Sequence, residues 1–444
     1  MANSVKTPTP PGSQQDMAAI KQPAKIGTFY SLTLRNFRLL WIGSLFSNFS
    51  QWVQSTTLSA VVYNMTGSGT LLQTINGIRS LPNLVIAPVS GLVADRVDRR
   101  KLMIYTQLPL LAMTLIMGIL FAFGVVKVWH LMVFAILSGI PGAVNQPVRS
   151  SVTPMIVPRF AMPNAVALNS GVFTFTRIIG PAAAGVMLAL SPATNFFIQS
   201  SAYALVMLTI YMTVIPNINR GPKKASLKAD FAEGFRYCVK NKAVRVLMVM
   251  GTFNPILVTP FQALLVIFAK EDFHMGSAGF GYLLAASGGG AVIGAVVIAS
   301  LNTFEKRGMI QLSGMIVWGA LVVLFTLVHA FWLAILVMMA IGAFQLVFIA
   351  TNQAMIQLSV PSKMMGRVTG IMAVQQGVLP VGSILIGVLT DVIGHKDTTI
   401  FIGTLSLILG LVLLAIPKIR NMGPTSAMQA QKEAEAAMGL APSS

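Results

Sequence analysis

Long runs of apolar residues recur along almost the whole chain, and they determine the solvent in which it can fold. Of the 444 residues, 55% are apolar and only 10% are charged, whereas soluble globular chains carry about 25% charged residues. So few charged side chains cannot cover so much apolar surface in water. The composition therefore predicts a membrane protein whose solvent is partly lipid.

Runs of about 20 mostly apolar residues are long enough for a helix to cross a bilayer, and the sequence contains twelve of them. The predicted spans are 38–63, 70–94, 102–126, 129–151, 164–190, 193–215, 246–269, 279–301, 309–329, 331–357, 366–390 and 398–416. Amides and prolines interrupt the fourth, seventh and eleventh spans. An all-α membrane protein with twelve transmembrane helices is the expectation.

The net charge of +19, from 31 Lys and Arg against 12 Asp and Glu, raises the question of nucleic-acid binding. If the N-terminus lies in the cytoplasm and the spans alternate, 26 of the 31 basic residues fall in cytoplasmic segments. The outer loops then hold only Lys127, Lys270 and Lys396. The positive-inside rule accounts for this distribution, so we expect both termini in the cytoplasm and no nucleic-acid partner.

A basic segment divides the spans into two sets of six. The predicted organisation is a disordered cytoplasmic tail (1–36), an N-terminal six-helix bundle (37–215), a basic cytoplasmic linker (216–245), a C-terminal six-helix bundle (246–416) and a cytoplasmic tail (417–444). The linker is compatible with an interfacial amphipathic helix or a solvated connection. Weakly similar amide, proline and glycine patterns in the two halves indicate duplication, and in transporters the substrate path lies between related halves.

Polar side chains within the spans are the main functional signal, because each costs free energy in hydrocarbon unless it faces protein or water. Spans 3, 6, 9 and 12 are almost free of amides except near their ends. We therefore expect a polar cavity lined by the inner helices, with these four helices facing lipid. The candidate substrate-pathway residues are Asn48, Gln51, Asn76, Arg79, Asn83, Asn145, Gln146, Asn169, Arg177, Asn254, Gln262, Gln345, Asn352 and Gln375.

Two of these candidates are arginines far from the span ends. Arg79 and Arg177 lie about 15 Å or more deep at 1.5 Å per helical residue, and no Asp or Glu occurs mid-span to neutralise them. An unpaired guanidinium at that depth needs a wet cavity, carbonyl groups or an anionic substrate. We expect at least one to face an anionic or catecholate-like cargo. The alternative is that both are interhelical struts bonded to amides.

The segment from Gly91 to Leu102 resembles the signature loop of the major facilitator superfamily, with Asp98 where that pattern normally has glycine. The segments 36–41 and 163–170 also resemble one branch of it, which includes the enterobactin exporter and some macrolide efflux proteins. The resemblance covers about residues 36–416. It implies the major facilitator fold, with two six-helix bundles that alternate access to a central site.

The resemblance also implies roles for two short motifs. One is a cytoplasmic latch that closes in the outward-open state, formed by Gly91, Asp95, Arg96, Arg99 and Arg100. The other is an incomplete exporter-like motif in span 5, formed by Gly171, Gly180, Pro181 and Gly185. The alternatives are that the latch charges only set topology and that the glycines only allow tight packing.

The leading functional hypothesis is a secondary transporter that exports a siderophore or a hydrophobic drug across the bacterial cytoplasmic membrane. An importer or lipid flippase of the same fold is the alternative, and a membrane receptor or embedded enzyme is the rival of another class. No nucleotide-binding loop, metal-ligand cluster or cofactor motif occurs, and the single cysteine, Cys238, excludes an internal disulfide. Coupling to the proton gradient follows from the family resemblance alone, and a monomer is expected.

Overall fold

The computed structural model describes residues 27–83, 86, 98–215, 227–300, 304–425 and 428. Every regular element among them is a helix, as the length of the apolar runs predicts. The N-terminal bundle consists of α2 (Tyr30–Thr33), α3 (Arg35–Thr66), α4 (Gly69–Ile78), α6 (Arg99–Ala122), α7 (Val128–Ile156), the 3₁₀ turn η1 (Arg159–Ala161), α8 (Met162–Leu190) and α9 (Pro192–Met212).

The C-terminal bundle follows the connecting helix α10 (Leu227–Lys240). Its elements are α11 (Lys242–Gly251), the π-helical segment η2 (Asn254–Val258), α12 (Thr259–Ile267), the π-helical segment η3 (Phe268–Asp272), α13 (Gly276–Ser300), α14 (Arg307–Thr326), α15 (Phe331–Ser359), α16 (Ser362–Gln375), the 3₁₀ turn η4 (Gln376–Val378), α17 (Leu379–Ile393), α18 (His395–Leu414) and α19 (Pro417–Arg420).

Nine helical stretches of the described residues are long and apolar enough to cross a membrane. The predicted count of twelve is therefore not confirmed. Span 1 corresponds to the long helix α3, which is rich in Ser, Thr, Asn and Gln, and span 2 is described only in part, with α4 as its helix. Span 11 is divided into α16, η4 and α17. Among these, α3 is one continuous helix, whereas span 11 is interrupted near Pro380.

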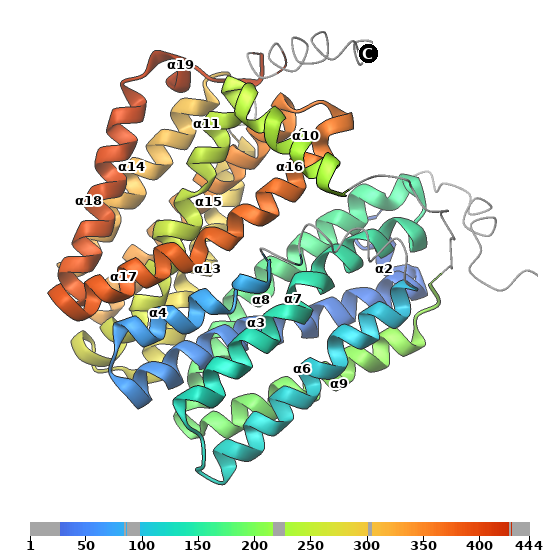
Figure 1. Cartoon of the computed structure of the whole chain (residues 1–444), viewed down its shortest axis with the longest axis vertical. Helices are drawn as coiled ribbons and strands as arrows, with labels where there is room; N and C mark the ends of the chain where they lie inside the picture. Colours follow the sequence, from blue (N-terminus) through green and yellow to red (C-terminus); the bar gives the residue numbers. More distant parts are fainter. Residues whose placement is uncertain are drawn as a thin grey trace, which may run out of the picture.

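The helices of each bundle are arranged as the polar pattern predicts. The amide-poor helices pack in pairs, α6 with α9 and α14 with α18. The two bundles meet through α4 against α17 and α8 against α13. They diverge toward the end where α2, α10 and α19 lie (Figure 1). We call this the basic end, since it carries Arg99, Arg367 and Arg420, and the other end the opposite end.

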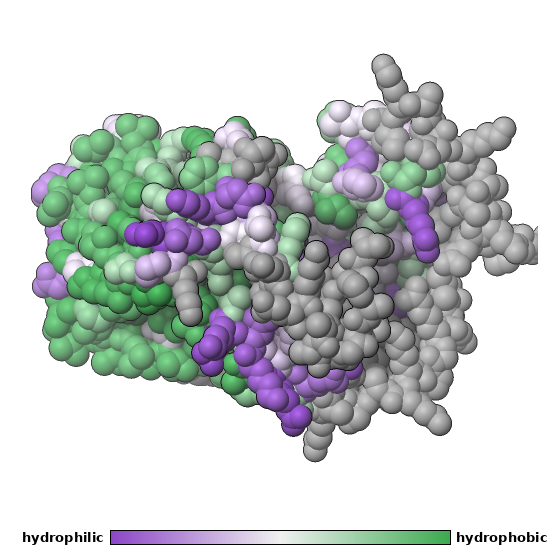
Figure 2. All heavy atoms as spheres, turned by 90° about the horizontal axis from the view of Figure 1, so that it is seen from above, coloured by the Kyte–Doolittle hydropathy of each residue, from purple (hydrophilic) through white to green (hydrophobic). Residues whose placement is uncertain are grey.

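The exterior is suited to lipid. Hydrophobic residues cover much of the surface over the C-terminal bundle, whereas hydrophilic residues gather near the middle of the view from above (Figure 2). Large apolar side chains such as Trp332, Leu336 and Val296 are 75%, 62% and 67% exposed. Exposed apolar area of this extent is stable when hydrocarbon, rather than water, surrounds it.

Helix α10 forms part of the predicted basic linker. It packs against α16, where Arg367 Nη1 donates to Glu233 Oε1 at 2.8 Å. Cys238 is buried in the cluster that includes Val244 and Met355, and this burial raises the pKa of its thiol to about 11. Because the thiolate is the reactive form, we expect Cys238 to react slowly with thiol labels, so introduced cysteines can be labelled selectively.

Small residues let the two bundles approach closely near the opposite end. A Cβ on Gly185 of α8 would lie 2.7 Å from the Ser277 carbonyl oxygen of α13, and one on Gly281 would overlap the Pro181 carbonyl. On the other seam, a Cβ on Gly77 would lie 3.0 Å from Pro380 Cα. The backbones are therefore in contact at both seams, which closes the interface at this level.

We predict that Gly281→Val destabilises the protein because the new side chain forces α13 away from Pro181. Overpacking of this kind costs about 1–3 kcal/mol, which lowers the melting temperature of the purified protein by several degrees. Gly289→Val, on the same helix, is the control, since nothing lies within 4 Å of a Cβ there. Equal melting temperatures for the two variants would contradict the proposed close contact.

Candidate functional site

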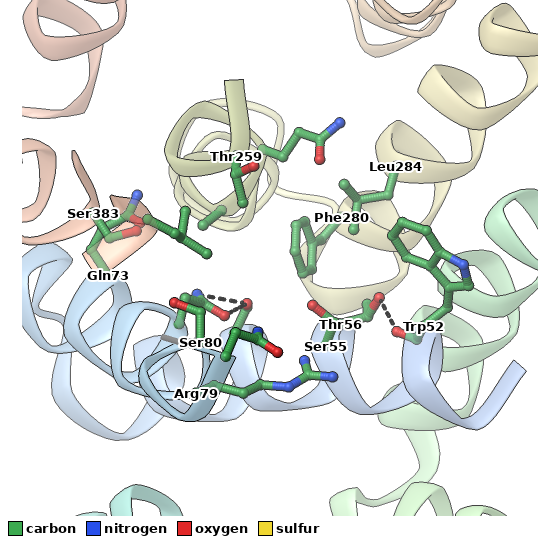
Figure 3. A pocket seen from close by; sticks show the side chains of 16 residues that line it. Trp52, Ser55, Thr56, Gln73, Arg79, Ser80, Thr259, Phe280, Leu284 and Ser383 are labelled. Carbon is green, nitrogen blue, oxygen red and sulfur yellow. Dashed lines mark hydrogen bonds between the residues drawn. The ribbon is translucent and has the colours of Figure 1, made fainter. Parts of the chain in front are cut away.

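A central cavity of about 280 Å³ lies between the two bundles (Figure 3). The N-terminal bundle contributes α3 with α4 and the residues just after it, and the C-terminal bundle contributes α12, α13 and α17. The lining residues are Trp52, Ser55, Thr56, Ser59, Gln73, Asn76, Arg79, Ser80, Asn83, Thr259, Gln262, Ala263, Phe280, Leu284, Leu379 and Ser383.

Two amide side chains of this cavity form hydrogen bonds that join the helices lining it. Asn76 Nδ2 donates to Ser59 Oγ at 3.1 Å, which joins α4 to α3. Gln73 is fully buried, and its Nε2 donates to the Pro260 carbonyl at 2.7 Å, which joins the two bundles. These contacts orient the polar side chains, so that the cavity has a defined shape in this conformation.

Arg79 is the charged residue of the central cavity. It follows α4 directly, and its guanidinium extends toward the side of the cavity formed by Ser55 and Thr56 (Figure 3). None of the residues that line the cavity is acidic. The positive charge is therefore available to polar or anionic groups that enter.

A second cavity, of about 600 Å³, is lined by α3, α7 and α8 together with two residues of α15. Most of its lining residues carry polar side chains, and again none is acidic. The lining residues are Leu40, Ser44, Ser47, Asn48, Gln51, Asn145, Arg149, Ser150, Thr153, Met162, Val166, Asn169, Ser170, Phe173, Thr174, Leu346 and Gln353. None of the lipid-facing pairs α6–α9 and α14–α18 contributes to either cavity.

Sequence reasoning missed Arg149, which it assigned to a cytoplasmic segment near the end of span 4. Helix α7 continues to Ile156, so Arg149 lies within the helix and is only 8% exposed. Its Nη1 donates to Ser44 Oγ at 2.7 Å, whereas Nε and Nη2 have no hydrogen-bond partner. The spacing from Asn145 was an available signal, because residues four apart share a helix face.

The structure distributes the predicted pathway residues over several environments. Asn76, Arg79, Asn83 and Gln262 line the central cavity, and Asn48, Gln51, Asn145 and Asn169 line the second one. The remaining described candidates, which line neither of these two cavities, are Arg177, Asn254, Gln345, Asn352 and Gln375. The side chain of Gln146 lies outside what the structure describes.

Arg177 is bound across the interface between the bundles. Its Nη2 donates to Gln345 Oε1 at 3.3 Å, and Gln262 Nε2 donates to the same oxygen at 3.2 Å. One amide oxygen of α15 thus connects α8 with α12. This geometry corresponds to the strut alternative for Arg177, with an amide as its partner.

The three other candidates outside the cavities are held within the C-terminal bundle. Gln311 Nε2 donates to Asn352 Oδ1 at 2.8 Å, and Gln375 Nε2 donates to the Met248 carbonyl. Asn254 begins the π-helical segment η2, and its buried Oδ1 has no hydrogen-bond partner. Helical periodicity identified these side chains as polar and inward but not which surface they meet.

The exporter-like motif consists mostly of close-packing positions. A Cβ on Gly180 would lie 2.6 Å from Trp52 Cβ of α3, and Gly185 and Pro181 form the contact with α13 described above. Gly171 has nothing within 4 Å of a Cβ. Three of the four residues are therefore explained by helix packing, and Gly171 has no packing role in this conformation.

Gly91, Asp95 and Arg96 of the predicted latch lie outside the described residues. Asp98, where the family pattern has glycine, caps α6 by accepting from the backbone N–H groups of Arg100 and Lys101. Arg100 donates to the Tyr211 carbonyl, and its guanidinium lies 5.3 Å from the centre of the Tyr211 ring. In this conformation Arg100 is bound within its own bundle.

Two carboxylates connect the bundles at the opposite end. Asp391 of α17 accepts from Ser68 Oγ at 2.8 Å and from the backbone N–H groups of Gly69 and Thr70 at 2.6 and 3.1 Å. These donors form the N-terminus of α4, which attracts negative charge. Tyr63 Oη likewise donates to Glu271 Oε1. We call these contacts the opposite-end lock.

Comparison with known proteins places the chain in a family. A family model described as transmembrane secretion effector matches residues 26–441. Macrolide efflux protein A of Streptococcus pyogenes is 22% identical, with 87% of this chain and 97% of the relative covered. The staphyloferrin A transporter of Staphylococcus aureus is 25% identical (87% and 95% covered). The multidrug efflux pump Tap of Mycolicibacterium fortuitum is 26% identical (77% and 86% covered).

Solved structures share the fold at low sequence identity. A POT family transporter in complex with 5-aminolevulinic acid aligns with a TM-score of 0.73 at 14% identity, covering 89% of this chain and 98% of that one. The nucleoside transporter NupG aligns with a TM-score of 0.68 at 13% identity, covering 85% and 98%. These likenesses establish the two-bundle transporter fold.

We predict that Asp391→Asn weakens the opposite-end lock, because the neutral amide loses the charge that the α4 N-terminus attracts. Hydrogen bonds to charged groups contribute about 1.5–3 kcal/mol, so the population separated at this end should rise about tenfold. Spin labels on Met65→Cys and Val392→Cys, one in each bundle, report the distance by pulsed electron resonance.

Asp397→Asn is the matched control, since Asp397 is an exposed carboxylate at the same end. An Asp391→Asn distance distribution identical to that of the control would show that Asp391 does not hold the bundles together.

Proposed function

The chain belongs to the transmembrane secretion effector family of the major facilitator superfamily, and on that premise we propose that it exports a small organic molecule by alternating access. The observation that carries the proposal is the pair of polar cavities at the bundle interface, lined by the inner helices. The bundles are joined at the opposite end and diverge at the basic end. This is the geometry of one of the two states that alternating access requires.

The proposed location is the bacterial cytoplasmic membrane, with the basic end and both termini in the cytoplasm. The three lysines Lys127, Lys270 and Lys396 lie at the opposite end, and the other described basic loop residues lie at the basic end. This asymmetry is what the positive-inside rule describes. The cavities then receive cargo from the cytoplasm in this conformation.

Export is favoured over import or lipid flipping by the relatives, because two of the three described above bear the names of efflux proteins. Those names also support a hydrophobic drug as cargo, and the name of the third relative supports a siderophore.

The family is one of transporters, so we propose no enzymatic reaction. The protein is proposed to act as a monomer.

The charge of the cavities supports an anionic or catecholate-like cargo. Arg79 lines the central cavity and Arg149 the second one, and no acidic side chain lines either. A guanidinium binds planar anionic groups through paired hydrogen bonds. We therefore assign the substrate-facing role to Arg79 and the strut role to Arg177, which Gln345 already engages.

Two further parts of the cycle are proposed from the family resemblance. The proton gradient supplies the energy. In the outward-open state, Asp95 and its neighbours Gly91, Arg96, Arg99 and Arg100 latch the basic ends together. In the conformation described here the basic ends are apart (Figure 1), so the latch would have to close later in the cycle.

We expect expression of the chain in efflux-deficient bacterial cells to lower the retention of at least one labelled siderophore or hydrophobic drug relative to a vector control. The measurement is the cell-associated label over time after loading. Dissipating the proton gradient with an uncoupler should restore retention. Accumulation of the label above the vector control would overturn the export direction.

Arg79→Gln is expected to weaken transport of anionic cargo more than transport of neutral cargo, by about tenfold or more, because a charge-assisted contact is lost. Initial efflux rates for a matched anionic and neutral pair provide the test. Arg177→Gln is the comparison, and it should affect both cargoes alike because Arg177 is a strut. Equal losses for both cargoes in Arg79→Gln would contradict a substrate-facing role.

A further inference from the structure

An apolar groove of about 430 Å³ lies on the C-terminal bundle, apart from the two interface cavities. Its walls are α11 with η2 on one side and α18 on the other, and Met315 of α14 and Ile419 of α19 also line it. Arg245 is its one charged lining residue. None of its lining residues belongs to either interface cavity.

The groove follows from the interruption of the span Lys242–Asp272. Helix α11 ends at Gly251, and the π-helical segment η2 contains Pro255. A π-helical turn and a proline both displace a helix from a straight course. Beyond this segment α12 packs against α18, whereas the groove separates α11 from α18. The local backbone geometry therefore opens the space.

The walls of the groove face the hydrocarbon. Val249 of α11 is 66% exposed, and Val412 and Leu409 of α18 are 55% and 40% exposed. Apart from Arg245 and Thr252, all of the lining residues are apolar. Apolar walls in contact with water are unfavourable, whereas an acyl chain in the groove makes favourable apolar contacts with them.

Arg245 places a positive charge at the mouth of the groove. It lies in the first turn of α11, which Asn241 caps, and it is exposed, with one hydrogen bond, from Nη1 to the Val239 carbonyl at 3.4 Å. From Arg245 to Ile256 the chain advances 11 residues, or about 16 Å at 1.5 Å per residue. This matches one leaflet of a hydrocarbon core about 30 Å thick.

We propose that this groove binds one anionic phospholipid, with an acyl chain between α11 and α18 and the phosphate on the Arg245 guanidinium. Arginine suits a phosphate because its planar fork of N–H groups binds two oxygens at once. The basic end attracts anionic lipids for the same electrostatic reason. The proposal does not depend on which cargo is exported.

The test is native mass spectrometry of the full-length protein in detergent, titrated with phosphatidylglycerol or with phosphatidylcholine of the same acyl chains. The wild type should bind phosphatidylglycerol more tightly than phosphatidylcholine. Arg245→Gln should weaken phosphatidylglycerol binding about tenfold and leave phosphatidylcholine unchanged. Arg245→Lys should retain most of the preference, since it keeps the charge.

Arg236→Gln is the matched control, because Arg236 is an exposed arginine of α10 outside the groove. Val249→Trp, which fills the groove, should weaken the binding of both lipids and provides a second route if Arg245→Gln expresses poorly. The proposal is overturned if the wild type shows no preference for phosphatidylglycerol. It is also overturned if Arg236→Gln weakens phosphatidylglycerol binding as much as Arg245→Gln does. A third contrary result is that the mass of the molecule displaced from the groove by Val249→Trp is not that of a lipid.

Discussion

The absence of water from the hydrocarbon core is the constraint on which the rest of this structure depends. A polar side chain at that depth must face protein or an internal cavity, and the two cavities between the bundles meet this requirement for the polar side chains that line them. The amide-poor helices α6, α9, α14 and α18 contribute nothing to either interface cavity. The separation of polar and apolar helices thus creates a path through the protein and a lipid-facing exterior together.

The closed seam at the opposite end combines two kinds of contact with different properties. Glycines such as Gly185 and Gly281 bring backbones together through short-range packing, which is lost as soon as the helices separate. Asp391 instead binds the N-terminus of α4 through charge-assisted hydrogen bonds. Both are contacts between preformed surfaces, so the bundles can separate there without unfolding.

The C-terminal half of the chain departs from ideal helices beside the apolar groove and at the central cavity. The π-helical segment η2 and its proline open the lipid-facing groove beside Arg245. The division of span 11 into α16, η4 and α17 places Ser383 and Leu379 at the central cavity. Irregular helices of this kind are tolerated because local π-helical and 3₁₀ hydrogen bonds satisfy the backbone groups that the interruption frees.

The sequence by itself determined the membrane class, the two-bundle organisation and the family resemblance, because apolar length, charge position and motif spacing are local properties. Eight of the predicted pathway residues line one of the two cavities, since periodicity defines the faces of a single helix. Only the tertiary structure decided which faces meet. Asp391 reaches the α4 N-terminus from more than 300 residues away, Arg177 meets Gln345, and the extension of α7 buries Arg149. Such pairings depend on how helices pack, and no single helix contains that information.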